Sequence, residues 1–278
     1  FIYVSGWQVA AESNGGTNTY PDLSLYPSNS GPNFVEKINN TLLRKMVELE
    51  KKAVPPVIAD AESGFGGVYN VFELTSQFIK SGVAGLHFED QLASEKKCGH
   101  MGGKVVIPTH EYINKLTSAR LASDVLGSPI VLIARTDSLN AKLMTSDFDE
   151  TDRPFLSNKR SSDGYYPIEK NEEMAITKSL AYAKYADVIW CETNTPDLGF
   201  AQEFASEIKK HYPDKILAYN CSPSFNWTDK FTDIEISNFQ KNLSEFGYRL
   251  QFVSLAGFHS MSSSMYNLAN NYKGGNMK

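Results

Sequence analysis

The sequence is poor in cysteine, and the few cysteines present are widely spaced. Cys98, Cys191 and Cys221 are the three cysteines among 278 residues, and no Cys-x-x-Cys pair occurs. An odd, small number of cysteines does not fit a disulfide framework, and their spacing does not fit a zinc site. We therefore expect a reducing, cytoplasmic environment.

Long apolar runs and blocks of basic residues are also missing. No stretch approaches the roughly 20 apolar residues of a membrane span. No charged segment followed by an apolar one opens the chain, so we expect no secretory signal. The net charge is −5, from 27 Lys and Arg against 32 Asp and Glu, without a Lys/Arg block. The sequence therefore predicts neither a nucleic-acid partner nor a membrane role.

Short β-branched or aromatic runs alternate with longer amphipathic stretches along the chain. The runs predict seven strands, at residues 2–5, 57–60, 85–89, 130–135, 188–192, 216–220 and 250–255. The stretches between them predict six helices, at residues 34–51, 71–81, 111–126, 172–185, 198–210 and 234–246. Near-continuous apolar strands that alternate with amphipathic helices indicate an α/β fold whose parallel sheet is covered on both faces.

The number of strands bears on the architecture. A closed (β/α)8 barrel needs eight strands. An open doubly wound sheet could stop at seven, but no Gly-x-Gly-x-x-Gly motif follows the first run. Because the chain is already strand-like from Phe1, we predict one TIM-type barrel domain over residues 1–278, with the first strand and the flanking helical segments outside this sequence. Its longest connection, residues 138–166, is predicted as a loop.

Acidic residues follow several predicted strands at their carboxyl ends, which is the face that holds the active site in barrels. Hard oxygen donors suit Mg²⁺ or Mn²⁺ rather than zinc. Mg²⁺ takes one or two direct carboxylates and keeps several waters, which leaves further acids in an outer shell. The alternative is a set of exposed or arginine-paired acids. The residues expected to converge are Asp60, Glu62, Glu89, Asp90 and Glu192.

Hydrogen-bond donors occur at the same predicted rim. The guanidinium of Arg135 matches a carboxylate with two parallel hydrogen bonds, although an ion pair with Asp137 is an alternative role. Together with a metal, these groups describe a site for a polyanionic organic acid. Further donors that could hold a second carboxylate are His100, Asn220, Ser222 and Ser224.

Cys98 lies in a glycine-rich stretch between Lys96-Lys97 and Gly99-His100. Two ammonium groups and an imidazole predict a lowered thiol pKa and a role in acid–base chemistry. The glycines predict a mobile loop that closes on a substrate. The alternative is a surface loop with an incidental cysteine.

The run Lys96-Lys97-Cys98-Gly99-His100-Met101 resembles the signature of the isocitrate lyase family. The resemblance is to the compact bacterial type, since the long insertion that fungal and plant forms have between Asn40 and Ala59 is absent. It implies a barrel that cleaves isocitrate to glyoxylate and succinate with Mg²⁺, in a homotetramer. Further matching motifs occur in the family's order at residues 3–11, 20–22, 59–67, 87–91, 220–227, 252–260 and 267–270.

The resemblance also implies roles for individual residues. Asp60 would bind the metal, and Cys98 would protonate the succinate portion of the cleaved substrate. The outer shell of the metal would contain Asp22, Glu62, Glu89 and Glu192. The catalytic set would be Cys98, His100 and Glu192. The glyoxylate portion would bind Ser5, Gly6 and Trp7, and the succinate portion Gly99, His100, Arg135, Asn220, Ser222 and Ser224.

Ser254 departs from the family, which has Thr at this position. The hydroxyl is kept and a methyl group is lost, so Ser254 is still expected to bind the substrate. A 2-methylisocitrate lyase is the nearest alternative, although Trp190 and Phe252 follow the isocitrate pattern. One methyl group discriminates by only about 1–3 kcal/mol. Two further alternatives are a truncated, non-catalytic homologue and a binding protein for organic acids.

Overall fold

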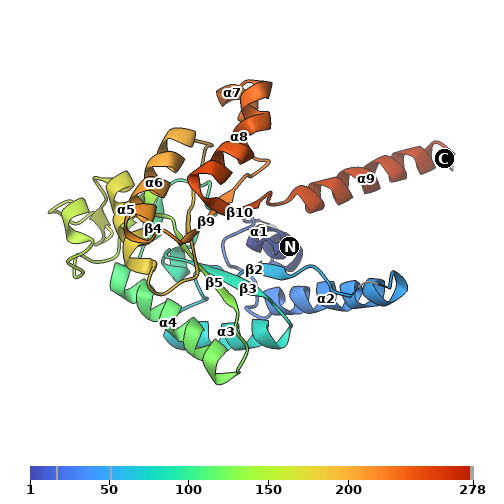
Figure 1. The fold of residues 1–278 in the computed structure, drawn as a ribbon, viewed down its shortest axis with the longest axis horizontal. Coiled ribbons are helices and arrows are strands. Elements are labelled where there is room, and N and C mark those ends of the chain that lie inside the picture. Colours follow the sequence, from blue (N-terminus) through green and yellow to red (C-terminus); the bar gives the residue numbers. More distant parts are fainter. Residues whose placement is uncertain (17, 51, 276–278) are drawn as a thin grey trace.

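The computed structural model describes residues 1–16, 18–50 and 52–275. Its main sheet contains seven parallel strands in the order β1-β2-β3-β5-β8-β9-β10 (Figure 1). All seven predicted strands are confirmed. Their bounds are β1 Ile2–Val4, β2 Val57–Asp60, β3 Gly85–Glu89, β5 Val131–Thr136, β8 Val188–Cys191, β9 Ile216–Asn220 and β10 Tyr248–Phe252.

The last strand lies earlier in the sequence than predicted. It was expected at residues 250–255, but β10 ends at Phe252. Leu255 adopts a φ of 64°, in the left-handed region, and this turn ends the extended run before the following helix. Ser254 therefore lies in a connection at the end of the sheet rather than within a strand.

The sheet is curled so that its first and last strands approach each other. The rings of Tyr3 on β1 and Phe252 on β10 have centroids 4.4 Å apart, and Trp190 on β8 lies 5.0 Å from Phe252. These side chains form a small apolar cluster with Ile58 and Ile133 inside the curl. Within the described residues, β1 pairs only with β2 and β10 only with β9. The fold is therefore an incomplete (β/α)8 barrel, in which side chains rather than hydrogen bonds join the outer strands.

Helices cover the outside of this sheet, as predicted. Their apolar faces form the main core with the outward side chains of the strands. The helix predicted at residues 34–51 begins earlier and ends earlier, and Lys51 lies outside the described residues. The six predicted helices are α2 Ser30–Glu48, α3 Val68–Lys80, α4 Thr109–Val125, α5 Asn171–Tyr182, α6 Leu198–His211 and α8 Asp233–Phe246.

The prediction of one long loop over residues 138–166 is wrong. A second, three-stranded sheet contains β4 (Lys104–Val106), β6 (Ala141–Met144) and β7 (Tyr166–Pro167). Its strands are only two to four residues long, too short to show a period-2 pattern in the sequence. Short 3₁₀ turns at Ala93–Glu95, Ser138–Asn140 and Arg153–Phe155 accompany this sheet.

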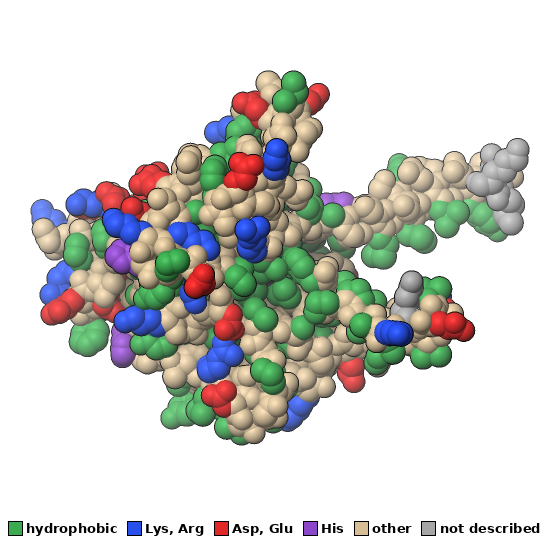
Figure 2. All heavy atoms as spheres, in the orientation of Figure 1, with side chains coloured by type: hydrophobic (Ala, Val, Ile, Leu, Met, Phe, Trp, Pro, Cys, Tyr) green, Lys and Arg blue, Asp and Glu red, His purple; other side chains and the backbone are tan. Residues whose placement is uncertain are grey.

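Three further helices were not predicted: α1 (Gly6–Ser13), α7 (Trp227–Lys230) and α9 (Ala256–Lys273). Helix α9 is rich in serine and asparagine, which are weak helix formers, and none of its residues is buried. Helices α2 and α9 extend from the barrel, and hydrophobic side chains are visible along both of them (Figure 2). Among the described residues, no helix has the length and apolarity needed to cross a membrane.

Candidate active site

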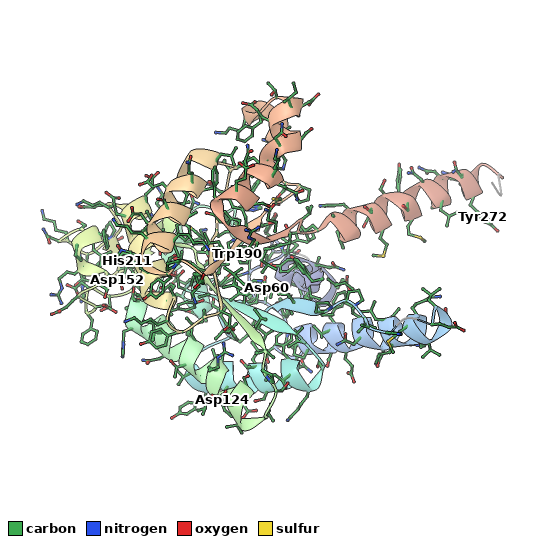
Figure 3. The ribbon with its side chains drawn as sticks, viewed as in Figure 1. Asp60, Asp124, Asp152, Trp190, His211 and Tyr272 are labelled. Carbon is green, nitrogen blue, oxygen red and sulfur yellow. The ribbon has the colours of Figure 1, made fainter. Side chains whose placement is uncertain are left out.

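A cavity of about 180 Å³ lies at the carboxyl ends of the barrel strands. Figure 3 shows two of its residues, Asp60 and Trp190, near the middle of the molecule. A larger and more open hollow of about 820 Å³ lies at the start of α4, but none of the predicted site residues lines it. The predicted residues that line the smaller cavity are Ser5, Trp7, Asp22, Asp60, Cys98, Gly99, His100, Arg135, Glu192, Asn220, Ser222, Ser224 and Ser254.

Three buried carboxylates form a compact cluster at the wall of this cavity. Asp22, Asp60 and Glu62 each offer an oxygen atom, and these atoms lie within 4.8 Å of one another. The backbone amide of Glu62 donates to Asp60 Oδ1 at 2.8 Å, and that of Gly6 donates to Asp60 Oδ2 at 3.1 Å. The two backbone amides therefore fix the orientation of the Asp60 carboxylate.

Gly6 and Glu62 support the cavity from behind its wall. A side chain at Gly6 would collide with the carboxylates of Glu62 and Asp60, so only glycine fits there. Glu62 accepts hydrogen bonds from Tyr26 Oη at 2.5 Å and from Ser24 Oγ at 3.0 Å. The acid cluster therefore depends on the Gly6 amide, which was predicted to bind substrate, and on the Ser24 and Tyr26 hydroxyls, which sequence analysis did not select.

Lys96 is buried within the acid cluster. Its ammonium group forms ion pairs with Asp22 and Glu62 and lies 3.8 Å from Glu89 Oε1. Burial alone would lower the pKa of Lys96. The negative charges of Asp22 and Glu62 outweigh burial and hold this pKa well above its usual value. One ammonium group thus faces several carboxylates and leaves a local excess of negative charge.

A divalent cation fits this arrangement. Burial, together with the neighbouring Glu62, raises the pKa of Asp60 to about 7. A carboxyl group with a raised pKa beside further acids would be stabilised in its ionised form by a cation. The donors are hard oxygens without a thiolate among them, which suits Mg²⁺ or Mn²⁺. The three acids are therefore a candidate metal site.

The expectation that Asp90 joins these acids is wrong. Its carboxylate accepts hydrogen bonds from Thr136 Oγ1 at 2.8 Å, Tyr182 Oη at 3.0 Å and the Asp137 amide at 2.8 Å. Lys178 lies 3.5 Å away. Asp90 is the residue after β3 ends, and Glu89 faces the cluster instead, because neighbouring residues at a strand end point to opposite sides.

Arg135 forms the ion pair with Asp137 that sequence analysis gave as the alternative to carboxylate binding. Its Nε and Nη2 donate to Asp137 at 2.9 and 3.1 Å, and its Nη1 lies 3.2 Å from Glu89 Oε2. The guanidinium also lines the cavity and lies 4.8 Å from the centre of the Trp190 ring. The ion pairs hold the guanidinium rigidly, so it can present a fixed donor group to a ligand carboxylate.

The prediction of a lowered thiol pKa at Cys98 is wrong. Cys98 is buried, and burial together with the nearby Asp22 raises the pKa of its thiol. Lys96, expected to act on the thiol, is instead ion-paired with acids. Lys97 points away and donates to the Gly103 carbonyl at 2.6 Å. Cys98 nevertheless lines the cavity together with the strand-end donors.

His100 connects the cysteine loop to the turn that follows β9. Its Nδ1 lies 3.1 Å from Ser224 Oγ, and its Nε2 lies 3.5 Å from Glu192 Oε1. Ser224 Oγ in turn lies 2.7 Å from Ser222 Oγ. The structure thus brings His100, Glu192 and the two serines to one side of the cavity. Glu192, which was also expected among the acids around the metal, lies beside His100 and outside the compact cluster of Asp22, Asp60 and Glu62.

Several cavity residues were not predicted. Tyr3 on β1 places its Oη 2.9 Å from His87 Nε2, and the His87 ring lies 3.7 Å from Asp60 Oδ1. The position of Tyr3, two residues before Ser5 in the strand predicted at residues 2–5, was the signal available in the sequence, because alternate residues of a strand share a face. The other cavity residues outside the predicted set are Tyr20, Trp190, Leu255 and His259.

The cavity contains buried polar atoms that lack a partner. Among the described residues, Trp190 Nε1, Glu192 Oε2 and Asn220 Oδ1 find no hydrogen-bond partner. Buried polar groups in proteins are nearly always paired, so atoms of this kind in a cavity indicate a polar ligand. The barrel and its cavity thus define a class: an α/β-barrel protein with a candidate metal site facing a thiol and carboxylate-binding donors.

The comparisons with known proteins give the family. The isocitrate lyase family matches residues 1–160 and 156–278, and this chain belongs to that family. It is 52% identical to an isocitrate lyase of Corynebacterium efficiens, covering 98% of this chain and 64% of the relative. It is 53% identical to an isocitrate lyase of Escherichia coli K12, covering 99% of this chain and 66% of the relative. The chain thus spans slightly less than two thirds of the length of these relatives.

Solved structures show the same fold. An oxaloacetate acetylhydrolase in complex with 3,3-difluorooxalacetate superposes with a TM-score of 0.67 at 23% identity, over 98% of this chain and 73% of that one. A 2,3-dimethylmalate lyase superposes with a TM-score of 0.65 at 24% identity, over 98% of this chain and 74% of that one. These likenesses support the barrel architecture.

Proposed function

We propose that this chain carries the active site of an isocitrate lyase, which cleaves isocitrate to glyoxylate and succinate with Mg²⁺. The observation that carries the proposal is that Cys98, His100, Asp60 and Arg135 all line one cavity. A binding protein for organic acids would need the donors and the metal, but it would not need a thiol facing them. Family membership supports the same conclusion.

The two ends of the cavity suit the two portions of the substrate. Arg135, fixed by Asp137 and Glu89, would hold a carboxylate of the succinate portion. Ser222, Ser224 and Asn220 would add hydroxyl and amide donors on the same side. The glyoxylate portion would lie near Ser5, the Gly6 backbone and Trp7, next to the acid cluster. In this proposal the bond to be cleaved would lie between the metal site and Cys98.

The metal site would consist of Asp60 with Asp22, Glu62 and Glu89 around it, the last three acting through water. Bound Mg²⁺ would acidify the substrate hydroxyl and stabilise negative charge on its oxygen. The protein's own contribution is orientation, because backbone amides fix Asp60 and hydroxyl groups fix Glu62. Lys96 would keep the surrounding acids charged.

The proton balance of the cleavage assigns roles to two residues. A base takes the proton of the substrate hydroxyl, the carbon–carbon bond breaks, and its electron pair stays on the succinate portion. Glu192 Oε2, buried and without a partner among the described residues, is the proposed base. The Cys98 thiol then gives its proton to the succinate portion, and in the reverse direction Cys98 takes it back. His100, close to Glu192 and Ser224, would orient the carboxylate beside the thiol.

Turnover of isocitrate by the whole protein tests this proposal. With Mg²⁺ we expect release of glyoxylate and succinate in equal amounts, and none after the metal is removed with EDTA. Cys98→Ser should lower kcat by about 10²–10⁴-fold, since a hydroxyl transfers the proton poorly. Cys221→Ser is the control, because Cys221 is buried outside the cavity. Full activity of Cys98→Ser would remove the thiol from the mechanism.

Ser254 supports 2-methylisocitrate as a second candidate substrate. Ser254 lines the cavity with Trp190, and its side chain is one methyl group smaller than the Thr of the family. A ratio of kcat/KM values above one in favour of 2-methylisocitrate would assign the chain to that reaction. A homotetramer and a cytoplasmic location stay predictions, which size measurement and cell fractionation would check.

A further inference from the structure

Lys104 is a fully buried lysine outside the cavity that joins two parts of the proposed active site. It is the first residue of β4, directly after the glycine-rich loop that carries Cys98. Its Nζ donates to the Gly99 carbonyl at 2.8 Å and to Asp137 Oδ1 at 2.7 Å. The same Asp137 carboxylate accepts two hydrogen bonds from Arg135. Lys104 thus links the loop backbone to the arginine that faces the substrate.

Gly99, whose carbonyl accepts the hydrogen bond from Lys104, is closely packed against two other residues of the proposed site. A side chain at Gly99 would collide with Glu192, and its Cβ would lie 2.6 Å from Arg135 Nη2. The loop backbone is therefore pressed against both residues. The hydrogen bond from Lys104 to the Gly99 carbonyl holds it there, and the neighbouring side chains of Cys98 and His100 then point into the cavity.

A second attachment fixes the loop on the other side of Cys98. The Gln91 side chain accepts from the Lys97 amide at 2.9 Å and donates to the Lys97 carbonyl at 2.8 Å. Cys98 therefore lies between two residues whose backbones are each tied to a buried side chain. The Gln91 attachment is uncharged, whereas the Lys104 attachment is shared with the ion pair of Asp137 and Arg135.

We propose that Lys104 is a positioning residue for the lyase reaction: it locks the Cys98–His100 loop to Arg135 through Asp137, so that the proton donor and the carboxylate-binding group keep a fixed separation. It touches no substrate and acts only through Gly99 and Asp137. This inference rests on the proposed function. A displacement of about 1 Å at a reacting group costs about 10²-fold in rate, which sets the size of the expected effect.

Lys178 provides a matched control. It is equally buried, and it likewise donates to a backbone carbonyl, that of Ile107 at 2.7 Å. It also faces two carboxylates, Asp90 at 3.5 Å and Asp152 at 3.8 Å. Lys178 does not line the cavity. Replacing either lysine leaves buried acids without their cation, so both changes should destabilise the fold to a similar extent.

The experiment compares Lys104→Met and Lys178→Met in the whole protein. For Lys104→Met we expect kcat to fall by about 10²-fold, with KM changed by less than about threefold because Arg135 remains paired with Glu89. For Lys178→Met we expect kcat per folded molecule to stay within about twofold of wild type. Lys104→Gln, whose amide can still donate to a nearby acceptor, should give an intermediate kcat and serves where the Met variant does not fold.

Alkylation of Cys98 by iodoacetamide, followed by mass spectrometry, gives a readout independent of turnover. We expect faster labelling of Cys98 in Lys104→Met than in wild type, and an unchanged rate in Lys178→Met. If wild type does not cleave isocitrate, the proposed function fails, and the labelling rates still test the role of Lys104. Equal kcat and labelling rates for the two lysine variants would overturn the inference.

Discussion

Two groups of buried charges in this molecule look alike in the sequence and differ in the structure. The cavity group contains Asp22, Asp60 and Glu62 around Lys96. The outer group contains Asp90 and Asp152 around Lys178, with Thr109, Thr136 and Tyr182 as hydroxyl donors. Both are built from acids near strand ends or loops and one fully buried lysine.

The difference lies in what the charges face. In the outer group, hydroxyl and amide donors saturate the carboxylates, and the group joins α4, α5 and the connection after β5. In the cavity group, the acids meet a cavity that also contains polar atoms without partners among the described residues. Burial of charge therefore does not by itself identify a functional site. Buried charge beside unpaired polar groups in a cavity does.

The largest effect expected from this comparison concerns Asp60. Asp60→Ala removes the carboxylate that two backbone amides orient toward the cavity. We expect kcat/KM for isocitrate to fall by about 10³-fold, or about 4 kcal/mol of transition-state stabilisation, together with the dependence on Mg²⁺. Steady-state kinetics over a range of Mg²⁺ concentrations measures both. An Asp60→Ala variant that keeps its Mg²⁺ dependence would place the metal elsewhere.

A change in the outer group should affect stability instead. Lys178→Met leaves Asp90 and Asp152 buried without their ammonium partner, which should lower the free energy of unfolding by about 3–5 kcal/mol. Denaturant unfolding followed by circular dichroism measures this change. The comparison would break down if Lys178→Met abolished turnover while the protein stayed as stable as wild type.

The smallest effect concerns acid stability at Asp137, which borders both groups. Burial alone would raise the pKa of Asp137. The positive charges of Arg135 and Lys104 outweigh burial and hold this pKa below its usual range. A carboxyl group with a depressed pKa contributes stability above its unfolded-state value of about 3.9, and this contribution is lost as the pH falls from there toward the folded-state pKa.

Asp137→Asn should therefore flatten the loss of stability below about pH 4, although it lowers the stability at neutral pH. Urea unfolding at several pH values between about 3 and 7 checks both parts. The Glu203→Gln variant is the control, because Glu203 is an exposed residue of α6. If Asp137→Asn lost stability below about pH 4 as steeply as wild type does, the role given to the ion pairs of Asp137 would be contradicted.

The barrel could be predicted from the sequence because its strands are continuous apolar runs and its helices are amphipathic. The three-stranded sheet could not be predicted, because pairs such as Tyr166–Pro167 are shorter than any periodic pattern. Helix α9 escaped prediction for a different reason: it is rich in serine and asparagine, which are weak helix formers, and none of its residues is buried in the core.

The candidate site was predictable where residue type determines chemistry, as for Asp60, Arg135 and His100. The directions of the side chains were not predicted correctly. Asp90 directly follows Glu89 at the end of β3, so alternation along the strand points the two carboxylates to opposite sides, Glu89 to the cavity group and Asp90 to the outer group. The electrostatic environment of Cys98 was also misjudged, because the sequence does not reveal that Lys96 is engaged by acids and that the thiol is buried.

Calorimetric titration of Mg²⁺ into the whole protein tests the central claim most directly. The claim is that the acid cluster at the cavity holds the metal and that the outer group does not. We expect one Mg²⁺ site in wild type and in Lys178→Met, and no measurable binding in Asp60→Ala. Undiminished binding by Asp60→Ala, or loss of binding in Lys178→Met alone, would contradict the account.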